Sequence, residues 1–165
     1  MSESAFWKFS LRFYAQPGVA PACIELQDDA GVDVNLLFLF IFLAEAGRSV
    51  ARVDVARIDA AIAPWRNEVV RPLRAARRAL KNSPGVSGAE TLRSEVKRIE
   101  LEAERLQQEA LFVMFPAASI GVAAPRAQAA RANLAAYAQY LGSVPQAPLD
   151  VVLQAVINMA TDEHR

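Results

Sequence analysis

The chain has 165 residues, of which 53% are hydrophobic and 22% are charged, a composition typical of one globular domain rather than of a disordered segment. Lys and Arg together number 18, as do Asp and Glu, so the net charge is zero. Because dedicated nucleic-acid binders usually carry a basic excess, this balance argues against nucleic acid as the main partner. Cys23 is the one cysteine, which excludes an internal disulfide, and we expect it to be a buried small side chain rather than a nucleophile.

No segment is suited to crossing a membrane. The most apolar stretch, Val34 to Ala44, has eleven residues, whereas a spanning helix needs about 20. The first residues also lack the basic segment and apolar run of a signal peptide. We therefore expect a cytoplasmic protein that does not enter the membrane.

Abundant alanine, scarce glycine and the lack of long apolar–polar alternation predict an all-α fold. We expect a single helical domain over residues 1–165, a bundle of six or seven helices. The expected helices are 4–14, 19–30, 33–46, 53–81, 88–115, 125–141 and 148–160, with a polar tail at 161–165.

The helix 33–46 is expected at the centre of the bundle. Asp33 is suited to be its N-cap, and the run from Leu36 to Leu43 is apolar on every face. A helix without a polar face must be surrounded by protein. Asn35, one turn into this helix, should therefore be buried and hydrogen-bonded.

Two long helices follow the central one and should be antiparallel neighbours, because the loop between them is short. We expect the first, 53–81, to be interrupted at Pro64 and kinked at Pro72. The second, 88–115, has apolar residues at steps of three or four, which predicts one buried face. This face comprises Leu92, Val96, Ile99, Ala103, Leu106, Ala110 and Val113.

Charged residues of these long helices provide the main candidate site. Arg66 and Arg77 fall on or beside the predicted apolar face, where an unpaired charge would be costly. They are therefore either ion-paired inside the bundle or line a polar cavity. Glu100 and Glu104 repel each other at a spacing of four, so an Arg–Glu network between the two helices is expected. The candidate ligand-binding residues are Asp33, Asn35, Arg66, Arg77, Glu100 and Glu104.

Signals for catalysis and metal binding are weak. Asp28, Asp29 and Asp33 could together hold a divalent ion, but a second aspartate-rich helix is lacking, and capping and solvation of helix ends explain them better. His164 is the only histidine, and phosphate-binding glycine loops and nucleophile motifs are absent. We assign no catalytic residue, no metal and no cofactor, and we favour a protein that is not an enzyme.

Several short motifs occur in a familiar order. They are Pro17-Gly18-Val19, Leu26-Gln27-Asp28, Gly31, Asp33-Val34-Asn35-Leu36-Leu37, Trp65-Arg66, Pro72-Leu73-Arg74, Arg77 and Glu100 to Arg105. Over residues 5–115 the sequence resembles a family of small proteobacterial proteins known only as a domain of unknown function. It departs from the family pattern at Phe42, where a tryptophan often stands. The resemblance implies a bacterial, cytoplasmic, helical protein and no activity, and it leaves out the alanine-rich helical part 116–165.

Three functions stay open. The first is an interaction or regulatory protein that binds another protein, or a second copy of itself, through helix faces. The second is a binding protein or enzyme for an anionic small molecule, which would use the candidate residues above. The third and weakest is nucleic-acid binding through a basic stripe of Arg71, Arg74, Arg78 and Lys81.

Overall fold

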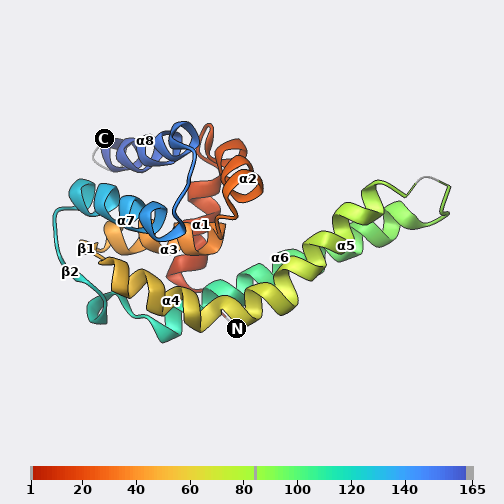
Figure 1. Cartoon of the computed structure of the whole chain (residues 1–165), viewed down its shortest axis with the longest axis horizontal. Helices are drawn as coiled ribbons and strands as arrows, with labels where there is room; N and C mark the ends of the chain where they lie inside the picture. Colours follow the sequence, from red (N-terminus) through yellow and green to blue (C-terminus); the bar gives the residue numbers. More distant parts are fainter. Residues whose placement is uncertain (1, 84, 163–165) are drawn as a thin grey trace.

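The computed structural model describes residues 2–83 and 85–162, so Pro84 of the expected loop and the end of the expected tail, with His164, lie outside it. The described residues form the seven expected helices, with the fourth divided in two, and confirm the all-α bundle (Figure 1). The helices are α1 (Ala5–Tyr14), α2 (Val19–Ala30), α3 (Val34–Glu45), α4 (Arg52–Trp65), α5 (Arg71–Lys81), α6 (Ala89–Met114), α7 (Arg126–Leu141) and α8 (Gln146–Asp162).

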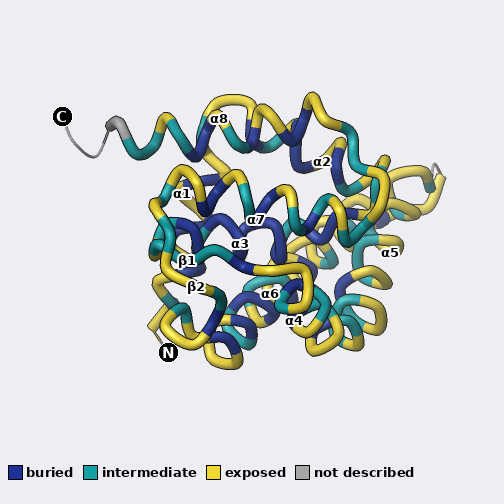
Figure 2. The backbone as a smooth tube through the Cα atoms, turned by 60° about the vertical axis from the view of Figure 1, so that its left-hand side comes forward, coloured by how far each residue is buried: buried dark blue, intermediate teal, exposed yellow. Residues whose placement is uncertain are grey.

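Helix α3 lies at the centre of the core, as its uniform apolar sequence predicted. Asp33 caps it, because its Oδ1 accepts the backbone N–H groups of Asn35 and Leu36. Figure 2 shows this helix buried along its length, with α1 and α7 against it. Phe40 is fully buried and its ring lies 5.0 Å from that of Tyr137 on α7. Helices α2 and α8 pack together on the outside of this layer.

A short two-stranded ribbon, which the sequence did not predict, closes one end of the core. Strand β1 (Arg48–Ser49) pairs antiparallel with β2 (Val122–Ala123). Gly121 precedes β2 with φ +64°, and a Cβ there would lie 2.1 Å from the carbonyl oxygen of Ser49, so only glycine fits. The buried amide of Asn133 joins this ribbon to α3, since its Nδ2 donates to the carbonyls of Phe40 and Arg48.

Helices α4 and α5 form one continuous rod through the π-helical turn Arg66–Val70. The expected interruption at Pro64 is wrong, because Pro64 lies inside α4. The irregularity falls just before Pro72, which lies in the first turn of α5. In the π turn, the N–H of Arg71 donates to the carbonyl of Arg66, five residues back. The wider turn relieves the clash that Pro72 would make with the carbonyl four residues earlier.

Helix α5 and the first part of α6 project from the rest of the molecule as a helical hairpin, residues 71–104, which we call the arm (Figure 1). The remaining elements are called the body. The expected antiparallel pairing of the two long helices is present. The expected buried face of α6 is mostly wrong, because Leu92, Ile99, Leu106 and Val113 are exposed. The buried face of α6 lies beside them and includes Glu100, Ala103, Gln107 and Leu111.

Candidate functional site

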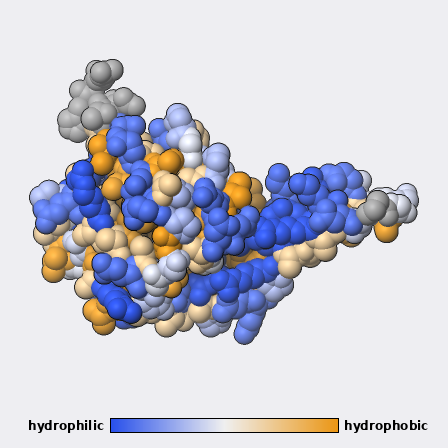
Figure 3. All heavy atoms as spheres, turned by 45° about the horizontal axis from the view of Figure 1, so that its top comes forward, coloured by the Kyte–Doolittle hydropathy of each residue, from blue (hydrophilic) through white to orange (hydrophobic). Residues whose placement is uncertain are grey.

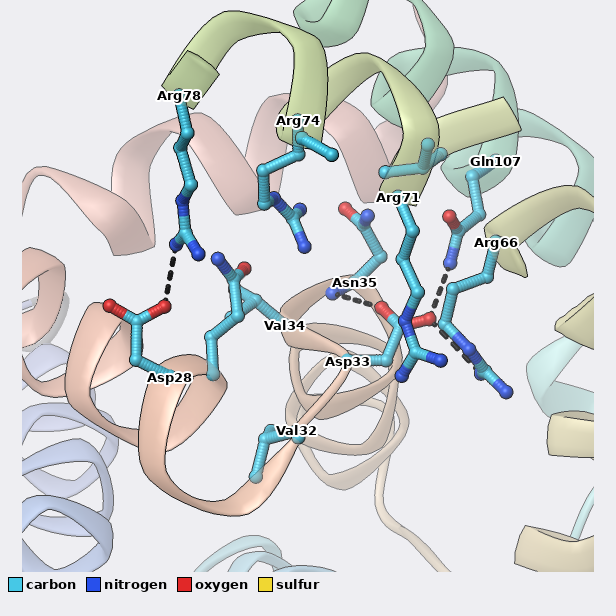
Figure 4. Close-up of a pocket in the computed structure, with 14 residues that line it drawn as sticks. Asp28, Val32, Asp33, Val34, Asn35, Arg66, Arg71, Arg74, Arg78 and Gln107 are labelled. Carbon is cyan, nitrogen blue, oxygen red and sulfur yellow. Dashed lines mark hydrogen bonds and ion pairs between the residues drawn. The ribbon is translucent and has the colours of Figure 1, made fainter. Parts of the chain in front are cut away.

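A polar cavity of 380 Å³ lies where the root of the arm meets the body. Its walls come from α5 on one side and from the end of α2 and the start of α3 on the other (Figure 4). Arginines dominate the charged groups around it. The charged and amide residues that line it are Gln27, Asp28, Asp33, Asn35, Arg66, Arg71, Arg74, Arg78 and Gln107.

Asp33 is the hub of this cavity. While its Oδ1 caps α3, its Oδ2 accepts hydrogen bonds from Arg66 Nη1 at 3.3 Å and from Gln107 Nε2 at 2.8 Å. Its backbone N–H donates to the hydroxyl of Tyr137, and burial together with the charge of Asp33 raises the pKa of that tyrosine. Because Asp33 fills the N–H groups at the start of α3, the positive charge of the cavity comes from arginines rather than from this helix end.

Arg66 is held in place by two carboxylates. Its Nη1 also pairs with Asp59 Oδ1 at 2.6 Å, and Asp59 in turn accepts the hydroxyl of Tyr140 at 2.8 Å. Burial alone would lower the pKa of Arg66, but the hydrogen bond to Asp59 and the charge of Asp33 outweigh it and raise that pKa. Nε of Arg66 and Oε1 of Gln107 are buried without a partner among the described residues. Such unsatisfied atoms typically cost about 1–3 kcal/mol each.

Three further arginines extend from α5 toward α2 and the start of α3 (Figure 4). Arg78 Nη2 pairs with Asp28 at 2.6 Å, and Arg74 pairs with Glu100 and Glu104 at 3.2 Å and 2.9 Å. Arg71 bonds only the amide oxygen of Asn67, and no carboxylate in the described part of the chain lies within ion-pair distance of it. One charge of the cavity is therefore left without a counter-charge.

The expected Arg–Glu network between the long helices is present, beside this cavity. Arg77 forms a short charge-assisted contact with Glu100 through its Nε, and this hydrogen bond raises the pKa of Arg77. Glu100 is 6% exposed and accepts from both Arg74 and Arg77. Burial raises the pKa of Glu104, against the opposing charge of Arg74. Arg77, Glu100 and Glu104 thus lie together, and among the described residues they form no ion pair with Arg66 or Asp33.

The six predicted residues are therefore distributed over two neighbouring cavities. Asp33 and Arg66 line the first, Arg77, Glu100 and Glu104 line the second, and Asn35 lines both. Asn35 is buried and hydrogen-bonded as expected, because its Oδ1 accepts Nε2 of Gln108, whose Oε1 accepts the hydroxyl of Ser10.

Sequence reasoning assigned Arg71, Arg74 and Arg78 to a different role. Their spacing of three and four residues did place them on one face of α5, but that face was interpreted as an outer basic stripe. In the structure this face of α5 lines a concave cavity instead of facing open solvent. No sequence signal pointed to Asp59. It lies in α4, seven residues before Arg66, and the two side chains meet because they lie on the same side of the continuous rod, about two helical turns apart.

The arrangement is suited to holding an anion rather than to acid–base or metal chemistry. Asp28 and Asp33 pair with different arginines, and the described residues contain no cluster of three His, Cys, Asp or Glu side chains that could hold a metal ion. Cys23 lines the second cavity, but burial raises the pKa of its thiol to about 12. The thiol is therefore protonated at neutral pH and a poor nucleophile.

The fold and the cavity define an all-helical protein with an arginine-lined cavity. The pattern of the family described as "Protein of unknown function (DUF2390)" matches residues 5–111. The chain belongs to this family, which confirms the resemblance found in the sequence. No curated protein and no solved structure matches the chain. No helix among the described residues is long and apolar enough to span a membrane.

Proposed function

We propose that the protein binds an anionic small molecule, a phosphate or a carboxylate, in the cavity between α5 and the start of α3. The observation that carries this proposal is the set of unused donors around one cavity. Arg66, Arg71, Arg74 and Arg78 each keep at least one guanidinium nitrogen without a hydrogen-bond partner among the described residues. The planar guanidinium group is the side chain best suited to phosphate and carboxylate recognition.

The roles of three of the four arginines follow from their partners. Arg66 and Arg74 are fixed by two carboxylates each, so their free nitrogens are held in one orientation before a ligand arrives. Such pre-organisation reduces the entropy that binding must overcome. Arg71 lacks a carboxylate partner, so its charge is available to the ligand. We assign Arg71 the main contact and Arg66 and Arg74 the supporting ones.

This geometry also weighs against nucleic acid. Arg74 and Arg78 are ion-paired and line a concave cavity, whereas phosphate-backbone binding needs an open, uncompensated basic surface. We propose binding only, and we assign no catalytic step to the residues that line the cavity. The bacterial and cytoplasmic setting expected from the sequence stays a prediction.

Calorimetric titration with inorganic phosphate and pyrophosphate tests the proposal. We expect saturable binding that Arg71→Ala weakens by about tenfold, the loss of one charge-assisted contact. Arg98→Ala is the matched control, because Arg98 lies on the outer face of α6 in an exposed pair with Glu95. The proposal is wrong if no phosphate or carboxylate anion binds, or if Arg98→Ala and Arg71→Ala weaken binding equally.

A second candidate function is supported by the exposed apolar residues of α6. Leu92, Ile99, Leu106 and Val113 repeat every seven residues, a spacing typical of helices that pack along a partner helix. We call these four residues the apolar stripe. In this candidate function, a protein partner or a second copy of the chain covers the stripe. Sedimentation analysis of wild type and Ile99→Lys over a range of concentrations tests this, since only a stripe-mediated assembly would dissociate in the variant.

A further inference from the structure

A second cavity, of 510 Å³, lies between the arm and helices α1 and α2. Apolar and aromatic side chains form much of its wall. Leu11, Tyr14, Ile24 and Leu101 line it and are 49%, 43%, 52% and 52% exposed. Large apolar side chains that gather in a hollow while still open to solvent are typical of a ligand-binding site. Figure 3 shows apolar atoms where the base of the arm leaves the body.

The two cavities adjoin. Gln27, Val34, Asn35 and Arg74 line both of them, so a single molecule lying past Arg74 would contact both. Arg74 is fixed at this junction by Glu100 and Glu104. Its Nη1 has no hydrogen-bond partner in the described part of the chain. One side of the junction is thus rich in guanidinium donors and the other is rich in apolar surface.

Building on the proposed function, we infer that the ligand is an amphipathic anion with a phosphate or carboxylate group among the arginines and an apolar body in the second cavity. An inorganic anion would leave the apolar wall exposed to water, and a neutral apolar molecule would leave the arginine donors unused. Both volumes lie within the range of about 300–1,000 Å³ that is usual for small-molecule sites.

The second cavity also contains charged residues, three basic and two acidic. Its wall carries Arg77, Lys97, Glu100 and Glu104 in addition to Arg74. Arg74 and Arg77 pair with the two glutamates, so no unpaired carboxylate is left to repel an approaching anion. Lys97 is the one basic residue of this wall without an ion pair in the described part of the chain, whereas four arginines line the first cavity. We therefore place the anionic group in the first cavity, beside Arg71.

Calorimetric titration with octyl phosphate, octanoate, inorganic phosphate and octanol, all kept below micelle concentrations, tests this inference. We expect at least one of the chain-bearing anions to bind about tenfold or more tightly than inorganic phosphate, because the chain buries apolar surface. The tighter of the two identifies the head group. We expect octanol to bind more weakly than that anion.

Ile24→Asn provides the decisive variant, because Ile24 lines only the second cavity and is exposed enough for the fold to tolerate the change. The variant should lose the extra affinity that the alkyl chain of the ligand provides, and its affinity for inorganic phosphate should stay unchanged. Val53→Asn is the control, since Val53 is exposed on α4 and lines neither cavity. Arg71→Ala should weaken the binding of both phosphate and the chain-bearing anion.

The possible results distinguish failure of the amphipathic ligand from failure of the proposed anion binding. Equal affinity for inorganic phosphate and for both chain-bearing anions would overturn the amphipathic ligand and leave anion binding in place. Octanol binding as tightly as the anions would also overturn it. Absence of binding by all anions, with or without a chain, would overturn the proposed function itself.

Discussion

The body and the arm are held together by different forces. In the body, Phe40 and its neighbours on α3 are buried on every side. In the arm, α5 contributes no buried residue at all, and it is tied to α6 by Arg74 and Arg77 through Glu100 and Glu104. Apolar burial stabilises the body, while directional ion pairs fix the arm in position. A segment that must hold arginines over a cavity benefits more from directional contacts than from a large core.

The largest effect should follow from a cavity in the body. Phe40→Ala removes a fully buried ring that packs against Tyr137, and such changes typically cost about 3–5 kcal/mol. Urea denaturation followed by circular dichroism measures this loss. A loss below about 1 kcal/mol would mean that α3 is not the centre of the core.

A smaller effect, confined to the arm, should follow from Glu100→Ala. This change leaves Arg74 and Arg77 without their shared buried carboxylate, and we expect a loss of about 2–3 kcal/mol. Hydrogen exchange should speed up in α5 while the amides of α3 stay protected. Glu95 is an exposed glutamate on the same helix, so Glu95→Ala should change neither the free energy of unfolding nor the hydrogen exchange of α5. Faster exchange in α3 would show that arm and body unfold as one unit.

The arm should also respond to pH through Glu104. Burial raises its pKa above the ordinary value of 4.5, so the folded state binds this proton more tightly than the unfolded state does. The resulting stabilisation is full below pH 4.5 and is lost as the pH rises through the raised value. Relative to Glu104→Gln, the wild type should therefore lose protection in α5 as the pH rises across that window. Parallel pH profiles for the two proteins would contradict this.

The smallest effect should follow from Leu92→Ala in the apolar stripe. Leu92 is exposed on the arm, so the free energy of unfolding should change by less than about 0.5 kcal/mol. The measurement is again urea denaturation, at two protein concentrations. A larger loss that grows with concentration would show that another molecule covers the stripe.

The local signals in the sequence predicted the fold well, and the contacts between distant segments explain what they missed. Asp33 as a cap, α2 at Val19–Ala30 and the burial of α3 each depend on a few neighbouring residues. The ribbon β1–β2 depends on two strands of two residues that are over seventy positions apart, too short to leave a pattern. The periodicity of α6 located an apolar face, but periodicity does not say which face a helix buries.

Part of the candidate site also follows from local signals in the sequence. Arg66, Asp33 and Asn35 stood out because charged or polar groups on apolar helices need partners. The importance of Arg71 could not be predicted, because it rests on the absence of a carboxylate that only the folded chain reveals.

The π turn at Arg66–Val70 makes the cavity depend on residue count as well as on residue type. Each residue advances an α-helix by about 100°, and a π turn accommodates one extra residue within a continuous rod. Loss of a single residue there would convert the turn to α-helix and rotate α5 about its axis, directing Arg71, Arg74 and Arg78 away from α3. An insertion or deletion in this five-residue stretch would therefore change which face of α5 points toward α3. Relatives that bind the same ligand should have a stretch of the same length.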